Sequence, residues 1–225
     1  MTNTTEKLNK VLPHQLFKEV REELMDFIEN AEAGEVAFLF GSHKVGKKTA
    51  LESALCKTQD AYADYREKNP QLMPVLAYEL ETSLDDKTYV VDVIEGLTEK
   101  LLPQFDIPEV DRAVLAYEKA GTRLKPSGKR EQLTHLLKER CTRVIALYEA
   151  HILSKKPALL QLVLDTFRSI AKKTGSVLII VGDYHARELS EASNGFLLST
   201  TPIHFPVYNP NLYDGHITGW SNIMG

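Results

Sequence analysis

Apolar runs alternate with amphipathic stretches along most of this chain. The runs at residues 36–40, 73–80, 144–147 and 177–181 predict buried strands, and residues 203–207 predict a short fifth strand. Between the runs, apolar residues recur at three- and four-residue spacing. That spacing predicts helices over residues 13–32, 48–68, 85–102, 131–141 and 157–173, with a further short one at 111–119.

Uniformly apolar strands that alternate with helices predict a mostly parallel sheet with helices on both faces. We therefore expect a three-layer α/β/α fold over residues 13–210, with a flexible N-terminus (residues 1–12) and a C-terminal tail (residues 211–225). Ligands of such sheets bind at the carboxyl ends of the strands. Candidate functional residues are therefore sought where each predicted strand ends.

The first strand ends in a glycine, and a Gly-Lys pair follows four residues later, just before a predicted helix. This is the strand–loop–helix order of a phosphate-binding P-loop, whose glycines let backbone N–H groups approach a polyphosphate. Lys47 would reach the β- and γ-phosphates of ATP. The alternative is a glycine-rich turn with solvated lysines. The candidate ATP-binding residues are Gly41, Ser42, His43, Lys44, Val45, Gly46, Lys47, Lys48 and Thr49.

The positions that should hold Mg²⁺ differ from the usual pattern. A hydroxyl is expected directly after Lys47, but Lys48 stands there and Thr49, the candidate metal ligand, comes one place later. Tyr148 replaces the aspartate expected at the end of the third strand, and a phenol of pKa ~10 does not bind a metal at neutral pH. Either hydrolysis is weak or lost, or Lys48 replaces part of the metal's charge.

Two carboxylates at strand ends are the candidate catalytic residues. Glu149 stands where a carboxylate that activates water belongs. Asp183 follows the fourth strand and would position water or sense the γ-phosphate; alternatively, it caps a helix that starts near His185.

Charge and composition limit the remaining roles. The 225 residues carry a net charge of −4, with a pI near 6.0, so nucleic-acid binding would need a local basic patch. The most basic loop, residues 121–130, contains the candidates Arg123, Lys125, Lys129 and Arg130; the alternative is a solvated loop. With two cysteines, no leader and no membrane-length apolar run, we expect a cytoplasmic protein with reduced thiols in its core.

In order, these motifs resemble the AAA+ ATPases of the TniB/TnsC type, which are MuB-related regulators of transposition within the wider ORC1/DEAH-like group. Residues 41–49 are similar to Walker A, residues 144–151 to Walker B, and residues 177–183 to the sensor-1 strand. The chain departs from the family at Lys48 and Tyr148. It also lacks an arginine in residues 196–202, and we expect the helical lid to be reduced or absent.

The resemblance implies an ATP-dependent homo-oligomer that assembles on double-stranded DNA and recruits a transposase or a targeting partner. ATP would lie between neighbouring subunits, and DNA would follow the basic loop. Two other hypotheses stay open. The chain could be a P-loop relic that serves as a protein-interaction adaptor, or a small-molecule kinase-like enzyme.

Overall fold

The computed structural model describes residues 15–82, 85–101, 125–185 and 200–207, and within them the chain forms a single parallel sheet. The strands lie in the order β2-β3-β4-β1-β5, and each pairs in parallel with its neighbours. Because all five run the same way, their carboxyl ends share one edge. The strands are β1 (Val36–Gly41), β2 (Val75–Glu79), β3 (Val144–Tyr148), β4 (Val177–Gly182) and β5 (Thr200–Phe205).

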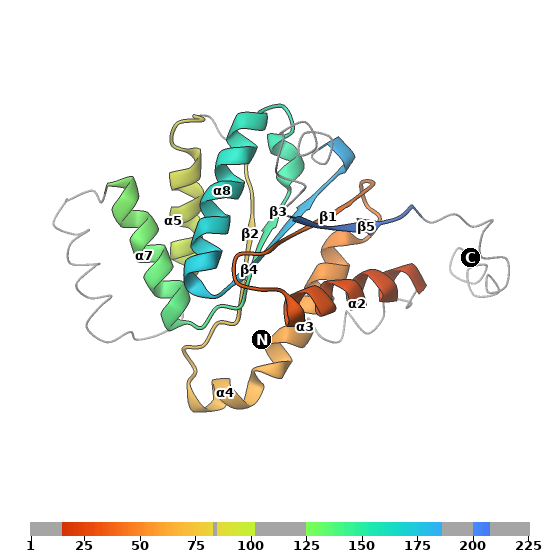
Figure 1. The fold of residues 1–225 in the computed structure, drawn as a ribbon, viewed down its shortest axis with the longest axis horizontal. Helices are drawn as coiled ribbons and strands as arrows, with labels where there is room; N and C mark the ends of the chain where they lie inside the picture. Colours follow the sequence, from red (N-terminus) through yellow and green to blue (C-terminus); the bar gives the residue numbers. More distant parts are fainter. Residues whose placement is uncertain (1–14, 83–84, 102–124, 186–199, 208–225) are drawn as a thin grey trace, which may run out of the picture.

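Helices cover both faces of this sheet (Figure 1). One face packs against α5, α7 and α8, and the other against α2 and α3. The predicted three-layer α/β/α fold is therefore confirmed. The helices are α2 (Gln15–Asn30), α3 (Lys47–Ala61), α4 (Ala63–Lys68), α5 (Tyr89–Leu101), α7 (Pro126–Glu139), α8 (Pro157–Thr174) and the short 3-10 helix η1 (Ala150–Leu153).

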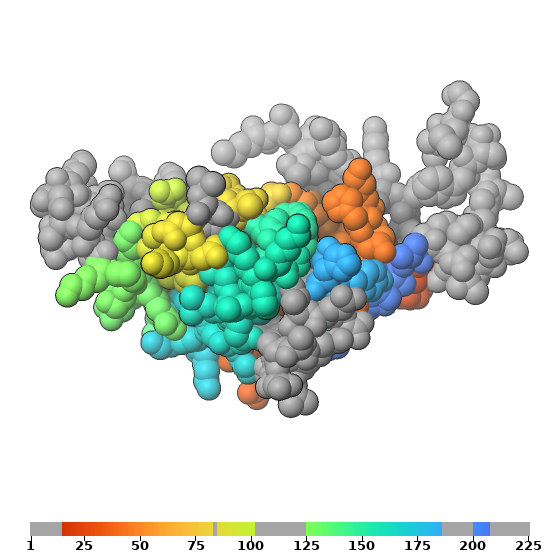
Figure 2. All heavy atoms as spheres, turned by 90° about the horizontal axis from the view of Figure 1, so that it is seen from above, coloured from red at the N-terminus to blue at the C-terminus, as the bar shows by residue number. Residues whose placement is uncertain are grey.

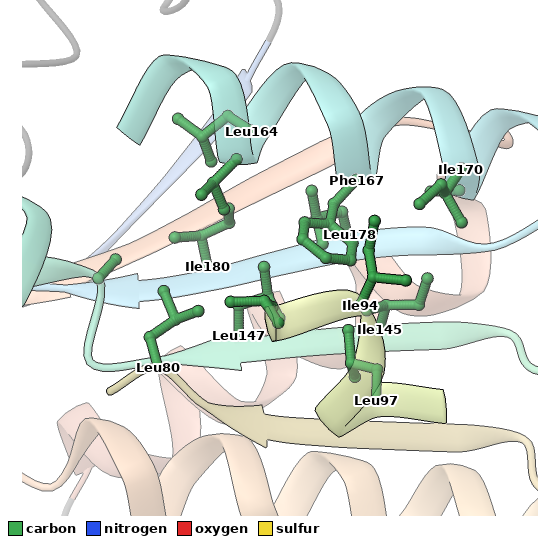
Figure 3. Packing of buried hydrophobic residues seen from close by; sticks show 14 of the residues in the cluster. Leu80, Ile94, Leu97, Ile145, Leu147, Leu164, Phe167, Ile170, Leu178 and Ile180 are labelled. Carbon is green, nitrogen blue, oxygen red and sulfur yellow. The ribbon is translucent and has the colours of Figure 1, made fainter. Parts of the chain in front are cut away.

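Alternation along each strand sends side chains into two separate cores. In β3, Ile145 and Leu147 pack toward α5 and α8, where they meet side chains such as Phe167 (Figure 3). Ala146 and Tyr148 belong to the opposite core, beneath α2 and α3. Burying a leucine or isoleucine side chain contributes about 1.5–3 kcal/mol, so both cores help to hold β3 in the middle of the molecule.

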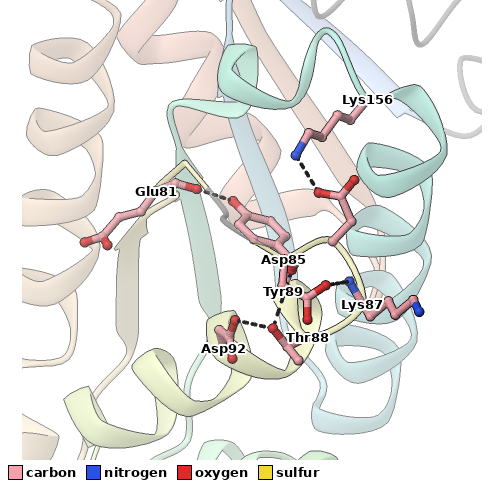
Figure 4. Close-up of polar contacts among 8 residues, drawn as sticks. Glu81, Asp85, Lys87, Thr88, Tyr89, Asp92 and Lys156 are labelled. Carbon is pink, nitrogen blue, oxygen red and sulfur yellow. Dashed lines mark hydrogen bonds and ion pairs between the residues drawn. The ribbon is translucent and has the colours of Figure 1, made fainter.

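The connection from β2 to α5 is fastened by polar contacts (Figure 4). The Tyr89 hydroxyl donates to the Glu81 carbonyl oxygen at 2.9 Å, and Thr88 donates to the Asp92 carboxylate at 3.0 Å. Burial, followed by the nearby Tyr78 and Glu81, raises the pKa of Tyr89 to about 12. The phenol therefore stays a neutral donor, and the contact holds this connection beside the carboxyl edge of the sheet.

Several predicted boundaries are wrong by a few residues. The helix expected over 48–68 is broken at Tyr62 into α3 and α4. Helix α7 begins at Pro126 and not at 131, because proline fits the first helical turn, where its missing N–H costs nothing. Lys129 and Arg130, expected in a loop, are thus helical. Strand β5 begins at Thr200 and not at 203.

The other expectations about the ends and the cysteines have mixed outcomes. Cys56 and Cys141 form no disulfide with each other; Cys56 is partly buried, whereas Cys141 is exposed, so the expectation that both thiols lie in the core is wrong for Cys141. The terminal segments 1–12 and 211–225, the short helix at 111–119 and Arg123 lie outside the described residues. Among the described helices, none combines the length and apolar character that crossing a membrane requires.

Candidate nucleotide site

The loop between β1 and α3 has a backbone that favours glycine at both of its ends. Gly46 has φ 101°, in the left-handed region that L-residues rarely adopt. Gly41 lies so close to β5 that a Cβ on it would sit 2.4 Å from the Phe205 carbonyl oxygen. Lys44 also has a positive φ, of 61°. This backbone shape brings the loop around to the first turn of α3.

The ammonium group of Lys47 lies inside that loop. Its Nζ donates to the Gly41 carbonyl oxygen at 2.8 Å and to the Ser42 carbonyl oxygen at 2.6 Å. An ammonium has three N–H donors, so two carbonyls hold the group in place and one donor remains for an anion. Burial lowers the pKa of Lys47, and the negative charges of Asp183 and Glu149 act in the opposite direction.

The beginning of α3 adds backbone donors to the same place. The helix starts at Lys47, and its first turn closes with the Ala50 amide on the Gly46 carbonyl oxygen at 2.9 Å. The N–H groups before Ala50 therefore precede the intrahelical hydrogen bonds, and the helix dipole favours negative charge there. Phosphate groups fit such a helix start.

A pocket of about 300 Å³ opens above the loop, at the carboxyl edge of the sheet. Seen from above in Figure 2, orange atoms of the α3 region lie close to blue atoms from the end of β4. The pocket joins residues that sequence analysis placed at three separate strand ends. It is lined by His43, Lys44, Gly46, Lys47, Lys48, Thr49, Tyr148, Glu149, His151, Val181, Gly182 and Asp183.

Glu149 reaches the pocket through an unusual backbone conformation. Its φ of 62° is left-handed, which is costly for a non-glycine residue and is often found at functional sites. Its Oε2 lies 3.1 Å from Nδ1 of His151, and both side chains are about one-third exposed. His151 therefore orients the carboxylate, a partnership that follows from the η1 turn and that spacing alone does not reveal.

The side of the pocket that Lys48 and Tyr148 line differs from a metal site. Lys48 Nζ lies 3.2 Å from Glu79 Oε2 and 5.6 Å from the centre of the Tyr148 ring. Glu79 and Tyr148 are registered neighbours on adjacent parallel strands, so their side chains share one face of the sheet. Sequence analysis missed Glu79, because its role depends on this strand pairing.

Mg²⁺ in P-loop sites is held by a hydroxyl after the loop lysine and by a carboxylate at the end of the third strand. Here the first position is an ammonium. The second is a phenol that is 5% exposed, and burial, followed by Glu52, Cys56 and Glu79, raises its pKa well above the ordinary range. A cation and a neutral phenol do not fit a dication. Thr49 lines the pocket, and its metal-binding role stays a prediction.

The predicted DNA-contacting residues lie elsewhere. Lys129 makes an ion pair with Glu95, which joins α7 to α5, and Arg130 lines a different pocket between α5, α7 and α8. Lys125 is exposed at the start of α7. None of these three lines the nucleotide pocket, and their contact with DNA stays a prediction.

The described fold is similar to that of several solved structures. The ORC1 protein of Aeropyrum pernix, solved in complex with DNA, matches with a TM-score of 0.55 and 17% identity, over 92% of this chain and 48% of that one. The chain has the fold of an AAA+ P-loop NTPase. At this identity, the match shows that the two proteins share the AAA+ fold and nothing more about this chain.

Two other solved structures match this AAA+ fold less well. The Walker-type ATPase of Pyrococcus abyssi gives a TM-score of 0.48 at 15% identity, over 86% of this chain and 54% of that one. The A. pernix ORC2 protein, in ADPNP-ADP complexes, gives 0.49 at 11% identity, over 88% and 49%. The chain thus spans about half the length of these proteins. No family model matches its sequence, and no curated protein is similar to it.

Proposed function

We propose that this chain is an ATP-binding AAA+ protein that works on DNA. The observation that carries the proposal is the position of Lys47, whose ammonium is held by two loop carbonyls at the floor of a pocket that also contains Glu149 and Asp183. An ammonium, backbone N–H groups and a helix start together make this place electropositive. A triphosphate would supply the matching negative charge.

The finer role that we propose is regulation of DNA transposition. In this role the chain forms a homo-oligomer on double-stranded DNA and recruits a transposase or a targeting protein. The order of Walker A, Walker B and sensor-1 motifs along the sequence supports this role. The comparison with ORC1, a DNA complex, supports the association with DNA.

Hydrolysis in the proposed protein is slow. Glu149, oriented by His151, is the candidate that activates water, and Asp183, directly after β4, lines the same pocket. Lys48 and Tyr148 leave the phosphates without the usual metal positions. ATP then acts mainly by binding, as a signal for assembly.

Titration with a fluorescent ATP analogue tests nucleotide binding. Lys47→Ala removes a charged donor, which weakens binding on the order of 100-fold. Lys57→Ala, an exposed lysine on the same helix, is the control and should bind as the wild type does. Equal affinity of the wild type and Lys47→Ala, with both proteins folded, would overturn the proposal.

Co-sedimentation with double-stranded DNA tests the second half of the proposal. We expect binding only with ATP. The Arg123→Ala/Lys125→Ala variant should lose affinity and reduce the salt dependence by about two released counterions. Lys129→Ala should have a smaller effect, because the Lys129 ammonium is already paired with Glu95. If DNA binds with the same affinity with and without ATP, and equally to the wild type and to these variants, the proposal is contradicted.

In the alternative function, the chain is a non-enzymatic adaptor that has lost the ability to bind a nucleotide. The replacement of both metal positions, by Lys48 and Tyr148, favours it. In that case no nucleotide binds under any condition, and Lys47→Ala leaves partner binding unchanged.

A further inference from the structure

One side of the pocket is formed by a lysine at a position where a metal ligand is expected. Lys48 is the second residue of α3, directly after the ammonium that the loop holds. Its own ammonium extends to the ends of β2 and β3, where it contacts Glu79 at 3.2 Å and lies over the Tyr148 ring.

These contacts form a resting position for a positive charge at the edge of the pocket. Lys48 and Glu79 are each about half exposed, so the ion pair between them is weak and exchanges readily with other partners. The Tyr148 ring is buried and fixed, and its face attracts a cation. The ammonium is therefore kept near the pocket without being locked in it.

The same two residues occupy the two positions where this kind of site usually holds a divalent ion, and the carboxylates that remain in the pocket are those of Glu149 and Asp183. An ammonium repels a dication, and a neutral phenol in place of a carboxylate supplies no anionic oxygen. Within the described part of the chain, no group of three or more histidine, cysteine, aspartate or glutamate residues is placed to bind a metal instead. The side chains at these two positions thus do not fit the divalent ion that P-loop sites usually hold there.

We propose that this site binds nucleoside polyphosphates without a divalent cation, with the Lys48 ammonium as a built-in counter-charge. On binding, Lys48 moves from Glu79 to the phosphate oxygens, and the Tyr148 face guides the short movement. The Thr49 hydroxyl then serves the phosphates and not a metal. This inference rests on the proposed nucleotide binding. It specifies in addition that the ligand is a polyphosphate without a bound metal ion.

Titration of the full chain with a fluorescent ATP analogue, in EDTA and in Mg²⁺, tests the inference. We expect affinities that agree within about threefold. Binding that weakens tenfold or more in EDTA would overturn the inference while leaving the proposed function intact. An absence of binding in both conditions would instead defeat the proposed function.

A second variant separates Lys48 from general charge effects. Lys48→Ser removes the counter-charge and restores a hydroxyl, so binding in EDTA should fall about tenfold or more and Mg²⁺ should recover part of it. Lys57→Ser, on the same helix, loses the same charge outside the pocket and should match the wild type in both conditions. If Lys48→Ser binds as the wild type does in EDTA, Lys48 is not the counter-charge.

Discussion

The two sides of the pocket differ in how far their residues match those of a phosphate-binding site. On the β1 side, Gly41, Gly46 and Lys47 have the backbone shape and the ammonium position that an anion needs. On the β2–β3 side, an ammonium and a phenol occupy the places of metal ligands. An anion-binding loop depends mainly on backbone geometry, whereas a metal site depends on a few side chains, so substitutions can change the second without changing the first.

The largest effect is expected from Gly46→Val, on the loop side. A β-branched residue resists φ 101°, so the loop must change shape and its N–H groups must turn away from the phosphates. We expect binding of the ATP analogue to fall on the order of 100-fold, while circular dichroism shows a folded protein. Wild-type affinity in this variant would contradict the claim that backbone geometry carries binding.

Gly41→Ala tests the contact between the loop and the sheet. The added Cβ would meet the Phe205 carbonyl oxygen at 2.4 Å, so β1 and β5 must separate locally. We expect the free energy of unfolding in urea to decrease by about 1–3 kcal/mol. An unchanged free energy would mean that β5 shifts without cost and that the glycine is not required for packing.

The pH dependence of binding reports on Lys47. Burial lowers its pKa, so its ammonium loses a proton at a lower pH than an ordinary lysine does. The charged form of Lys47 binds phosphate. The affinity for the ATP analogue should therefore be constant at pH values below the lowered pKa and fall about tenfold as the pH rises through it. In the Lys47→Arg variant the guanidinium stays charged. The affinity of this variant for the analogue should therefore not decrease over the same pH range, even if it differs from that of the wild type.

Glu79→Gln addresses the altered side and should have the smallest effect. Removing the carboxylate releases Lys48 from an exposed ion pair, which is worth less than about 1 kcal/mol. Affinity in EDTA should therefore increase about two- to threefold. A decrease would indicate that Glu79 holds Lys48 in its working position and not in a resting one.

The sequence predicted the fold and the loop because both depend on local patterns. Apolar runs mark the strands, and Gly46-Lys47 marks the loop. It did not reveal the contacts of Lys48, because Glu79 becomes its partner only through the register of β2 against β3. Nor did it reveal the pairing of Glu149 with His151, which depends on a left-handed backbone before η1.

A crystal structure with a non-hydrolysable ATP analogue in EDTA would show whether a polyphosphate lies in the β1–α3 loop. We predict phosphates against the first backbone N–H groups of α3 and the Lys47 ammonium, with Lys48 moved from Glu79 to the phosphates. A nucleotide bound elsewhere, or a loop that stays empty at saturating analogue, would contradict the claim.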